Sequence, residues 1–419
     1  MRYYKSSLRL NSFSYEIRGK ILERADAIEK SGKKVYRLNI GNLADFKLSS
    51  STKITREVID KLSDAEGYTE TKGLISARRS ILDFMSESFH VDATVDDVFM
   101  GNGVSELIIM SCQAMFENDD EVLLPTPNYP LWSASVSLSG AKPVHYKCME
   151  DYGWEPDISD LENKITCKTK AILIINPNNP TGAVYSKSIL FKIIELAKKH
   201  SLIVLSDEIY DHILYDRASH VSAASLDSNV ICLTYSGLSK NHRLAGFRSG
   251  WLVISGPIQF RLGLRDSLEK ILSMRLSANV PGQMAVAPAL QDFSSIAVLC
   301  SPGGRLYEQR KFCIERITQI AGINAVSPNG ALYLFVNVDR NTYDYSSMDD
   351  FVYELLSEEN ILVVPGSAFN WEEDNHFRMT FLPEIEQLSD IFDRLERFLE
   401  ARKTCIKPST AFKAETLEQ

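Results

Sequence analysis

The run Ala171-Ile172-Leu173-Ile174-Ile175 leads directly into Asn176-Pro177-Asn178-Asn179-Pro180-Thr181-Gly182, so an uninterrupted apolar stretch is followed at once by a turn. A short apolar run bounded by turn formers is typical of a strand that is buried on both faces of a parallel sheet. Asn-Pro and Thr-Gly steps are common in turns, and this accounts for the turn itself. It accounts less well for the concentration of amide side chains, which makes this loop a candidate binding element.

Similar apolar runs alternate with longer segments of helical periodicity along the chain. They are Val98–Met100, Glu121–Leu124, Val144–Tyr146, Leu202–Leu205, Val230–Thr234 and Trp251–Ile254. Together with the first run, this alternation predicts an α/β domain built on a mostly parallel, seven-stranded sheet. Ligands of such sheets bind where strands end and helices begin, so polar residues at strand ends are the most informative.

A chain of 419 residues is too long for one ordinary core and indicates more than one domain. We expect a large α/β domain over residues 49–300 and a smaller α+β domain over 301–402. Residues 1–48 are expected to add a helix and a strand to the smaller domain, and 403–419 to form a polar tail. The elements predicted outside the large domain are a helix over Tyr15–Lys30, a strand over Val35–Ile40, a strand within Gly330–Val338, a helix near 348–358, a strand over Ile361–Val364 and a last helix to about Leu399.

The bulk composition excludes several classes of protein. With 46 basic and 55 acidic residues, the net charge of −9 offers no global field to hold a nucleic acid. Met1 to Tyr15 contain no continuous apolar core, which argues against a signal peptide and a membrane span. The seven cysteines are scattered and show no CxxC spacing, which argues against a disulfide framework and a metal site. We therefore predict a cytoplasmic protein without metal.

Two strand ends carry features that suit an anionic ligand and its partner groups. Gly101–Glu106 stands between a strand and a helix expected to start near Leu107, where backbone amides and the helix dipole favour a phosphate. An ordinary capped turn is the simpler interpretation, and a dinucleotide fingerprint would need a glycine at Glu106. At the end of another strand, Asp207 and Tyr210 are placed so that both side chains can face one cleft, although such an Asp is often just a helix N-cap.

Two further sites place basic side chains beside strands. Lys240 ends the small-residue segment Ser236-Gly237-Leu238-Ser239, and Arg248 follows eight residues later. A lone lysine is usually solvated, but small neighbours allow burial, and a buried amine can be neutral and nucleophilic. Arg378 lies within the apolar stretch His376–Thr380, where an arginine on an edge strand is the plainer interpretation.

Taken together, the order, strand-end placement and spacing of these residues resemble the class I/II aminotransferases, which are fold-type-I enzymes dependent on pyridoxal 5′-phosphate (PLP). The resemblance runs from about Tyr15 to Leu399 and is most specific at Asn179–Gly182, at Asp207 with Tyr210, and at Ser239-Lys240 with Arg248. Within the family, the chain is most similar to the bacterial glutamate-pyruvate (alanine) aminotransferases. That likeness rests on Leu38–Asn42, Gly101–Glu106, Gly237–Lys240, Ala245–Arg248 and Ser277–Pro281.

The resemblance implies a role for each cofactor contact. Lys240 would bind PLP as a Schiff base and move a proton, and Asp207 would keep the ring nitrogen protonated. Tyr210 and Asn179 would hydrogen-bond the phenolic oxygen, and Tyr129 would stack on the ring. The phosphate would be held by Gly103, Val104, Ser105, Ser239, Arg248 and, from a neighbouring subunit, Tyr68.

For the substrate, the resemblance implies that Arg378 grips the α-carboxylate and that Gly41 lets the backbone approach it, with Asn179 nearby. Arg18 or Tyr15 is a candidate partner for a second carboxylate, as in glutamate. The use of Tyr68 implies a homodimer with shared active sites, and the reaction implied is amino transfer between an L-amino acid and a 2-oxo acid, with alanine/pyruvate and glutamate/2-oxoglutarate as the expected pairs.

Some alternatives stay open at this point. Many relatives have a serine where this chain has Gly237, and either Ser236 or Ser239 is available to replace it at the phosphate. A PLP-dependent lyase or cyclising enzyme would use the same lysine, aspartate and arginine, because the cofactor itself performs the bond breaking. A PLP-binding transcription regulator would need a basic DNA-binding module, and only about forty residues precede Gly41.

Overall fold

The structure is a computed structural model that describes residues 7, 10 and 20–404. Its largest feature is an eight-stranded sheet in the order β2-β9-β8-β7-β6-β3-β4-β5. The bounds of these strands are β2 Val98–Gly101, β3 Glu121–Thr126, β4 Lys142–Met149, β5 Glu155–Pro156, β6 Thr169–Ile175, β7 Ile203–Asp207, β8 Cys232–Gly237 and β9 Gly250–Ser255.

The pairing confirms the predicted α/β architecture. β4, β3, β6, β7 and β8 pair in parallel, and β9 runs antiparallel to both β8 and β2. All seven predicted strands are present. The additional strand, β5, pairs antiparallel with β4 at one edge of the sheet. It consists only of Glu155 and Pro156 and was not predicted, because it contains no apolar run.

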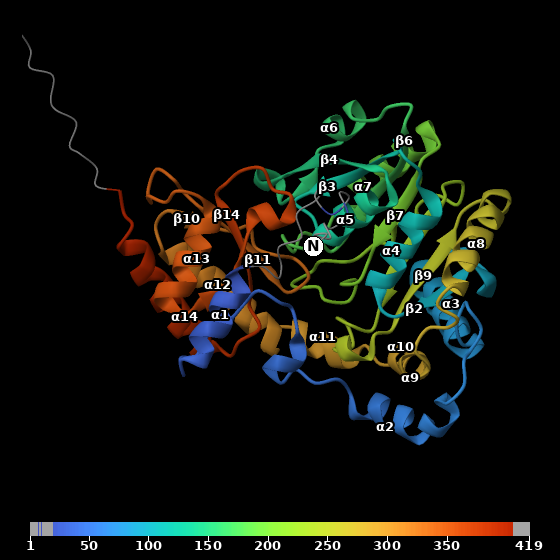
Figure 1. Cartoon of the computed structure of the whole chain (residues 1–419), viewed down its shortest axis with the longest axis horizontal. Helices are drawn as coiled ribbons and strands as arrows, with labels where there is room; N and C mark the ends of the chain where they lie inside the picture. The colour runs from blue at the N-terminus through green and yellow to red at the C-terminus, as the bar shows by residue number, and fades with distance from the viewer. Residues whose placement is uncertain (1–6, 8–9, 11–19, 405–419) are drawn as a thin grey trace, which may run out of the picture.

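Helices cover both faces of this sheet, as Figure 1 shows. β6 illustrates why the apolar run is continuous: Ile172 and Ile174 pack in a cluster on one face, and Leu173 and Ile175 pack in the cluster on the other. Burying such a side chain stabilises the fold by about 1.5–3 kcal/mol, and β6 gains this on both of its faces. The helices are α2 Thr52–Asp60, α3 Ile75–Phe89, α4 Val104–Met115, α5 Pro130–Ser139, α6 Ile158–Asn163, α7 Lys187–His200, α8 Ile258–Ser273, α9 Val280–Met284 and α10 Val286–Leu290.

The C-terminal part of the chain forms a second, smaller sheet in the order β10-β11-β14-β13, packed against helices. Its strands are β10 Ile323–Asn324, β11 Tyr333–Val338, β13 Val364–Pro365 and β14 His376–Thr380, and its helices are α11 Ser294–Cys300, α12 Arg305–Gln319, α13 Met348–Glu359 and α14 Ile385–Glu400. β14 lies between β11 and β13, so the interpretation of Arg378 as an edge-strand arginine is wrong.

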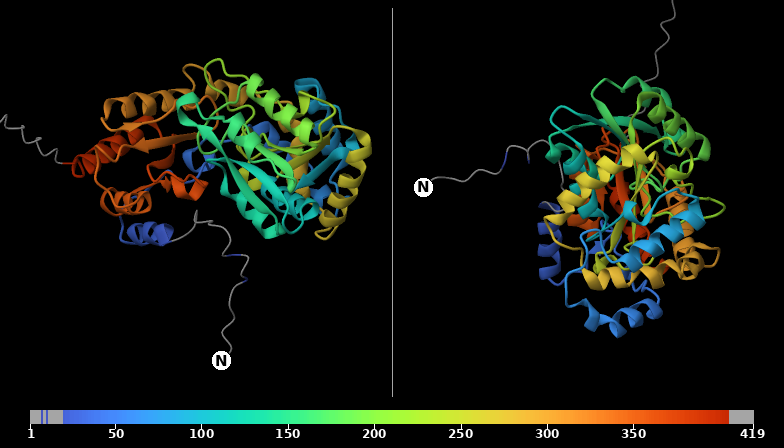
Figure 2. Two further views of the ribbon diagram at one scale, coloured as in Figure 1. Left: turned by 90° about the horizontal axis from the view of Figure 1, so that it is seen from above. Right: turned by 90° about the vertical axis from the view of Figure 1, so that its right-hand side faces the viewer.

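The N-terminal segment joins this smaller part. α1, Lys20–Lys30, packs its buried Ala25 and Ile28 against Leu356 of α13, and β1, Tyr36–Arg37, pairs in parallel with β12, Ile361–Leu362. Figure 2 shows α1 beside the C-terminal helices and α2 projecting at the margin of the molecule. The domain boundaries at residues 48, 300 and 402 remain a prediction.

Several predicted elements have different bounds. The strand expected over Val35–Ile40 forms only two ladder residues, and the stretch expected as one strand over Ile361–Val364 is divided between β12 and β13, which pair with different partners. The helix expected near Leu107 begins at Val104, and the part of the first predicted helix before residue 20 lies outside the described residues.

Within residues 20–404, no single helix is long and apolar enough to cross a membrane, and one bent pair, Val280–Leu290 with Ser294–Gln319, passes such a test by length and composition alone.

Candidate active site

A cavity of about 290 Å³ lies at the carboxyl ends of β6, β7 and β8. Parallel strands end at one edge of a sheet, so the polar residues that follow them in sequence meet there. The cavity is also closed by residues of the N-terminal segment and of the smaller sheet. Its lining includes the predicted residues Gly41, Val104, Ser105, Tyr129, Asn179, Asp207, Tyr210, Ser239, Lys240, Arg248 and Arg378.

Lys240 lies just beyond the end of β8 and is half-buried. Its Nζ donates a hydrogen bond to the Gly41 carbonyl oxygen at 2.8 Å and lies 5.9 Å from the centre of the Tyr210 ring. A Cβ on Gly41 would stand 2.6 Å from the hydroxyl oxygen of Tyr333, so only glycine allows the backbone this close to the cavity. The hydrogen bond to this one carbonyl oxygen holds the Lys240 amine inside the cavity.

The departure at Gly237 has a steric reason. A Cβ at this position would lie 2.7 Å from the backbone oxygen of Ser249, because β8 and β9 approach closely there. Ser236 points away from the cavity, and its hydroxyl donates to the Glu208 carbonyl at 3.5 Å. Ser239 lines the cavity, which favours it over Ser236 as the residue that takes the place of the missing serine.

Asp207 is the last residue of β7 and is only 4% exposed. Its Oδ2 accepts a hydrogen bond of 2.9 Å from Nε1 of Trp132, which is on α5. Burial raises the pKa of Asp207 to about 6, although the bond from Trp132 acts in the opposite direction. No helix starts at this point of the described chain, so the N-cap interpretation is wrong. A cationic group beside this buried carboxylate would stabilise its ionised form.

Tyr210 and Tyr333 form a buried pair on the other side of the cavity. Their hydroxyl oxygens are 2.7 Å apart, and their rings meet edge to face. Burial raises the pKa of Tyr210 well above its usual value. Burial acts on Tyr333 in the same direction, but the positive charges of Lys240 and Arg378 outweigh it and lower the pKa of Tyr333. Either hydroxyl can be the donor in this pair.

Arg378 is 4% exposed and is held by hydrogen bonds and by aromatic rings. Its Nη1 donates to Oδ1 of Asn179 at 2.9 Å, its Nη2 donates to the Asn39 carbonyl, and the guanidinium lies 4.4 Å from the centre of the Tyr333 ring. Its Nε is buried without a hydrogen-bond partner among the described residues. A buried guanidinium that lacks a carboxylate is costly unless a ligand supplies one.

The opposite end of the cavity suits a phosphate. Gly103 precedes α4 with φ +83°, and a Cβ there would stand 2.3 Å from Nη2 of Arg248. The amides of Val104 and Ser105 belong to the first turn of α4, where backbone N–H groups lack helical acceptors. Arg248 is exposed and donates to the carbonyls of Asn102 and Ala245 at 3.3 and 3.0 Å. The positive φ favours glycine at position 103, and a side chain there would displace the guanidinium from its place beside the helix start.

The donor set fits PLP. Three cations and a helix N-terminus surround the cavity, which suits two anionic ends, a phosphate and a carboxylate. Asp207 is a buried carboxylate that suits a cationic ring nitrogen, and Tyr129 lines the same space as an aromatic face. In the described part of the chain, no group of three or more His, Cys, Asp and Glu side chains is arranged to hold a metal ion.

Comparison with known proteins identifies the family that shares this arrangement. Residues 33–395 match the profile described as "Aminotransferase class I and II". The chain belongs to the class I and II aminotransferase family. Glutamate-pyruvate aminotransferase AlaA of Escherichia coli K12 is 46% identical over 395 residues, which cover 94% of this chain and 98% of that protein. An alanine aminotransferase of Mycobacterium tuberculosis H37Rv is 46% identical over 401 residues, covering 95% and 93%.

Solved structures agree with this assignment. An aminotransferase from Escherichia coli superposes with a TM-score of 0.94 at 45% identity, covering 96% of this chain and all of that one. An alanine aminotransferase from Pyrococcus furiosus gives 0.91 at 34% identity, covering 95% of this chain and all of that one. The protein is thus a PLP-dependent transaminase of fold type I that acts on amino acid and 2-oxo acid substrates.

Two predicted residues in the described part of the chain lie outside the cavity lining: Gly103, just before α4, and Tyr68, which is 82% exposed. Tyr15 and Arg18 lie outside the described residues. Two residues of the site were missed by the sequence interpretation, Trp132 and Tyr333. Tyr333 lies in a predicted strand, but a tyrosine within an apolar strand is usually a core residue, so its sequence position gave no sign of a role in the site. Trp132 had no signal, since it reaches Asp207 from a helix far away in sequence.

Proposed function

We propose that this transaminase exchanges amino groups between alanine/pyruvate and glutamate/2-oxoglutarate. The observation that carries the proposal is the pairing, in one cavity, of Arg378 with the cluster of Lys240 and Asp207. A guanidinium opposite the amine fixes an α-amino acid by its carboxylate. The names of the two relatives that are 46% identical support the choice of substrates.

PLP, when bound, acts as an electron sink that stabilises negative charge at the substrate α-carbon. The chain's own residues supply the rest. Lys240, whose amine is held inside the cavity by the Gly41 carbonyl, would anchor the cofactor and would carry a proton between the substrate α-carbon and C4′ of the cofactor. Asp207 would hold the proton on the ring nitrogen, and Trp132 orients that carboxylate through its hydrogen bond.

The remaining residues bind and orient. Asn179 and Tyr210 line the cavity and would hydrogen-bond the phenolic oxygen of the ring, and Tyr129 would stack on it. The amides of Val104 and Ser105, with Gly103, Ser239 and Arg248, bind the phosphate. Arg378 holds the substrate α-carboxylate against Gly41 and Asn179, and Arg18 or Tyr15 meets the second carboxylate of glutamate. Asn179, Tyr210 and Arg378 are buried, which excludes water from them and strengthens their electrostatic contacts.

We further propose a homodimer in which Tyr68 reaches the phosphate of the partner subunit's site. The exposure of Tyr68 supports this, since a tyrosine needed at its own site would be buried there. α2, which precedes Tyr68, carries exposed Ile59 and projects at the margin of the molecule, so this segment is available to a second copy (Figure 2). A cytoplasmic location stays a prediction.

Single-turnover spectroscopy tests the substrate choice. The PLP form is mixed with alanine, glutamate and a panel of other amino acids, and conversion to the pyridoxamine form is followed by absorbance. We expect alanine and glutamate to convert it fastest, without release of ammonia. Keto acid released together with ammonia, or a marked preference for aromatic or basic amino acids, would refute the proposal.

A further inference from the structure

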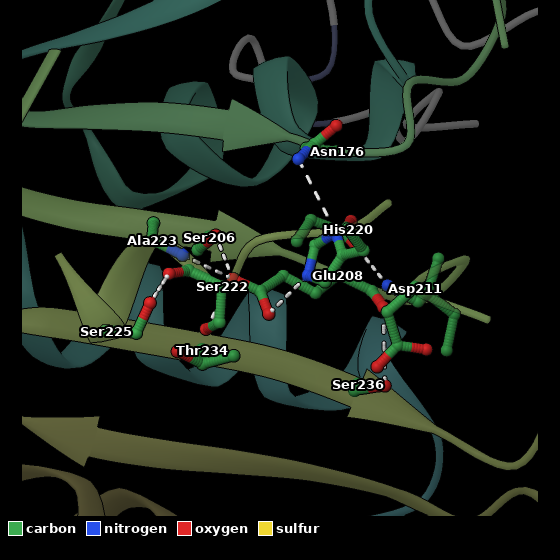
Figure 3. Close-up of polar contacts among 12 residues, drawn as sticks. Asn176, Ser206, Glu208, Asp211, His220, Ser222, Ala223, Ser225, Thr234 and Ser236 are labelled. Carbon is green, nitrogen blue, oxygen red and sulfur yellow. Dashed lines mark hydrogen bonds and ion pairs between the residues drawn. The ribbon is translucent and has the colours of Figure 1, made fainter. Parts of the chain in front are cut away.

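Glu208 and His220 belong to a buried polar cluster at the end of β7, whose contacts are drawn in Figure 3. Within the turn over residues 207–210, Asp207 and Tyr210 line the cavity, whereas Glu208 is directed away from it and is 1% exposed. A carboxylate buried this deeply is costly unless it is paired and hydrogen-bonded. The roles assigned to the cavity do not use it.

The Glu208 carboxylate is fully engaged. Oε1 accepts hydrogen bonds from Oγ of Ser206 at 2.7 Å, Oγ of Ser222 at 3.0 Å and the amide of Ala223 at 3.1 Å. Oε2 lies 3.0 Å from Nε2 of His220, whose side chain is 2% exposed. These partners come from β7 and from the segment 220–223, so the carboxylate joins the start of the turn to a second stretch of chain.

The backbone of Glu208 is fixed as well. Its amide donates to the carbonyl of Tyr235 in β8 at 2.8 Å, and its carbonyl accepts from the amide of Asp211 at 3.1 Å and from the hydroxyl of Ser236 at 3.5 Å. The turn is therefore tied both to the neighbouring strand and to this buried cluster.

His220 extends the cluster to the loop after β6. Oδ1 of Asn176 accepts from the Tyr185 amide at 2.9 Å, so the Nδ2 of Asn176 faces Nδ1 of His220, 3.5 Å away. Nδ1 then acts as an acceptor, and the proton on Nε2 is donated to Glu208. Burial lowers the pKa of His220, but the Glu208 and Asp211 carboxylates outweigh burial and raise it. The same loop carries Asn179, which lines the cavity.

We propose that Glu208 and His220 are a positioning pair that holds Asp207 and Tyr210 in their orientation toward the cofactor ring. The proposal rests on the proposed function, because it takes Asp207 and Tyr210 as ring partners. Side chains that orient a ligand from behind fix its geometry, and their loss usually reduces activity although they never touch the substrate.

The test compares the His220→Ala and His220→Gln holoenzymes with the wild type. We expect His220→Ala to lower kcat by roughly ten- to a hundredfold, the usual range for groups that orient a ligand from behind, with a KM for alanine close to that of the wild type. The visible circular dichroism of the bound cofactor should change, because it reports the orientation of the ring. His220→Gln keeps an N–H donor near the position of Nε2 and should restore most of both signals.

Arg261→Ala is the matched control. It breaks a buried ion pair of 2.8 Å with Asp97, at the end of β2 remote from Gly103, and should lower Tm while leaving kcat and the dichroism unchanged. If His220→Ala behaves like this control, with a lower Tm alone, the pair is merely structural and the proposal is wrong. If His220→Ala does not fold, Ser222→Ala removes one partner of Glu208 without unpairing a charge, and an unchanged dichroism and kcat there would overturn the proposal.

The two proposals fail in different ways. A wrong substrate assignment changes which amino acids convert the wild-type enzyme and leaves the dichroism of the variants altered. A wrong positioning role leaves the wild-type preference intact and the dichroism of His220→Ala unaltered.

Discussion

Replacing Asp207 by asparagine should stabilise the cofactor-free protein while it disables the enzyme. Burial raises the pKa of Asp207 from 3.8 to about 6, so the folded protein holds this proton more tightly than the unfolded chain does. At 1.36 kcal/mol for each pKa unit, the ionised carboxylate costs about 3 kcal/mol of folding free energy. The extra stability that the protonated carboxyl gives the folded protein is fully present below about pH 4 and is lost as the pH rises through about 6, the pKa of the folded state. An asparagine Oδ1 still accepts from Trp132 and has no charge to desolvate.

The assay is urea unfolding of the cofactor-free wild type and Asp207→Asn, at pH 5 and pH 8, followed by tryptophan fluorescence. The other ionisable groups titrate alike in the two proteins, so their contributions to the free energy of unfolding cancel in the difference. The variant's advantage should approach about 3 kcal/mol at pH 8 and roughly half of that at pH 5, where most of the folded wild type is still protonated. Equal advantages at the two pH values, or a less stable variant at pH 8, would refute the reasoning.

Adding PLP should remove the variant's advantage, because the carboxylate then faces a cationic ring nitrogen. Turnover of the variant should fall about ten- to a hundredfold, the equivalent of a lost charge-assisted hydrogen bond of about 1.5–3 kcal/mol. Near-normal turnover would show that Asp207 does not serve the ring.

Three further predictions concern the phosphate, the partner subunit and the substrate. Gly103→Ala puts a Cβ 2.3 Å from Arg248 and should weaken PLP binding roughly tenfold or more, measured by reconstitution of the cofactor-free protein; unchanged affinity would remove Arg248 from the phosphate. Mixing inactive Lys240→Ala with inactive Tyr68→Phe protein should restore some activity through hybrid dimers, and no recovery despite demonstrated subunit exchange would contradict a shared site. Arg18→Ala should reduce the single-turnover specificity constant for glutamate about ten- to a hundredfold and largely spare alanine; equal losses would exclude Arg18 from specificity.

The strand-end residues were predictable because the sheet is regular. The sequence predicted a mostly parallel sheet, in which residues after the carboxyl ends of strands meet at one edge. β6, β7 and β8 are parallel neighbours, and Asn179, Asp207 and Lys240 line one cavity. Periodicity carries this information because it is local in the chain.

Contacts between distant segments left no such local sign. Trp132 reads as a core aromatic of α5, and nothing near it in sequence indicates a bond to Asp207. Glu208 and His220 read as an ordinary charge after a strand and an ordinary loop histidine, although both are buried. The N-cap interpretation of Asp207 failed for a related reason: whether a helix follows depends on how the turn packs against β8.

The setting of Arg378 also bears on how the protein is made. The guanidinium is held by Asn179 from the middle of the chain and by Asn39 from its beginning, yet it is itself contributed by β14, close to the end. During synthesis, the reactive lysine therefore leaves the ribosome well before the group that captures substrate. The protein can bind an amino acid by its carboxylate only after these three distant parts of the chain have come together. Activity therefore begins only when the fold is complete.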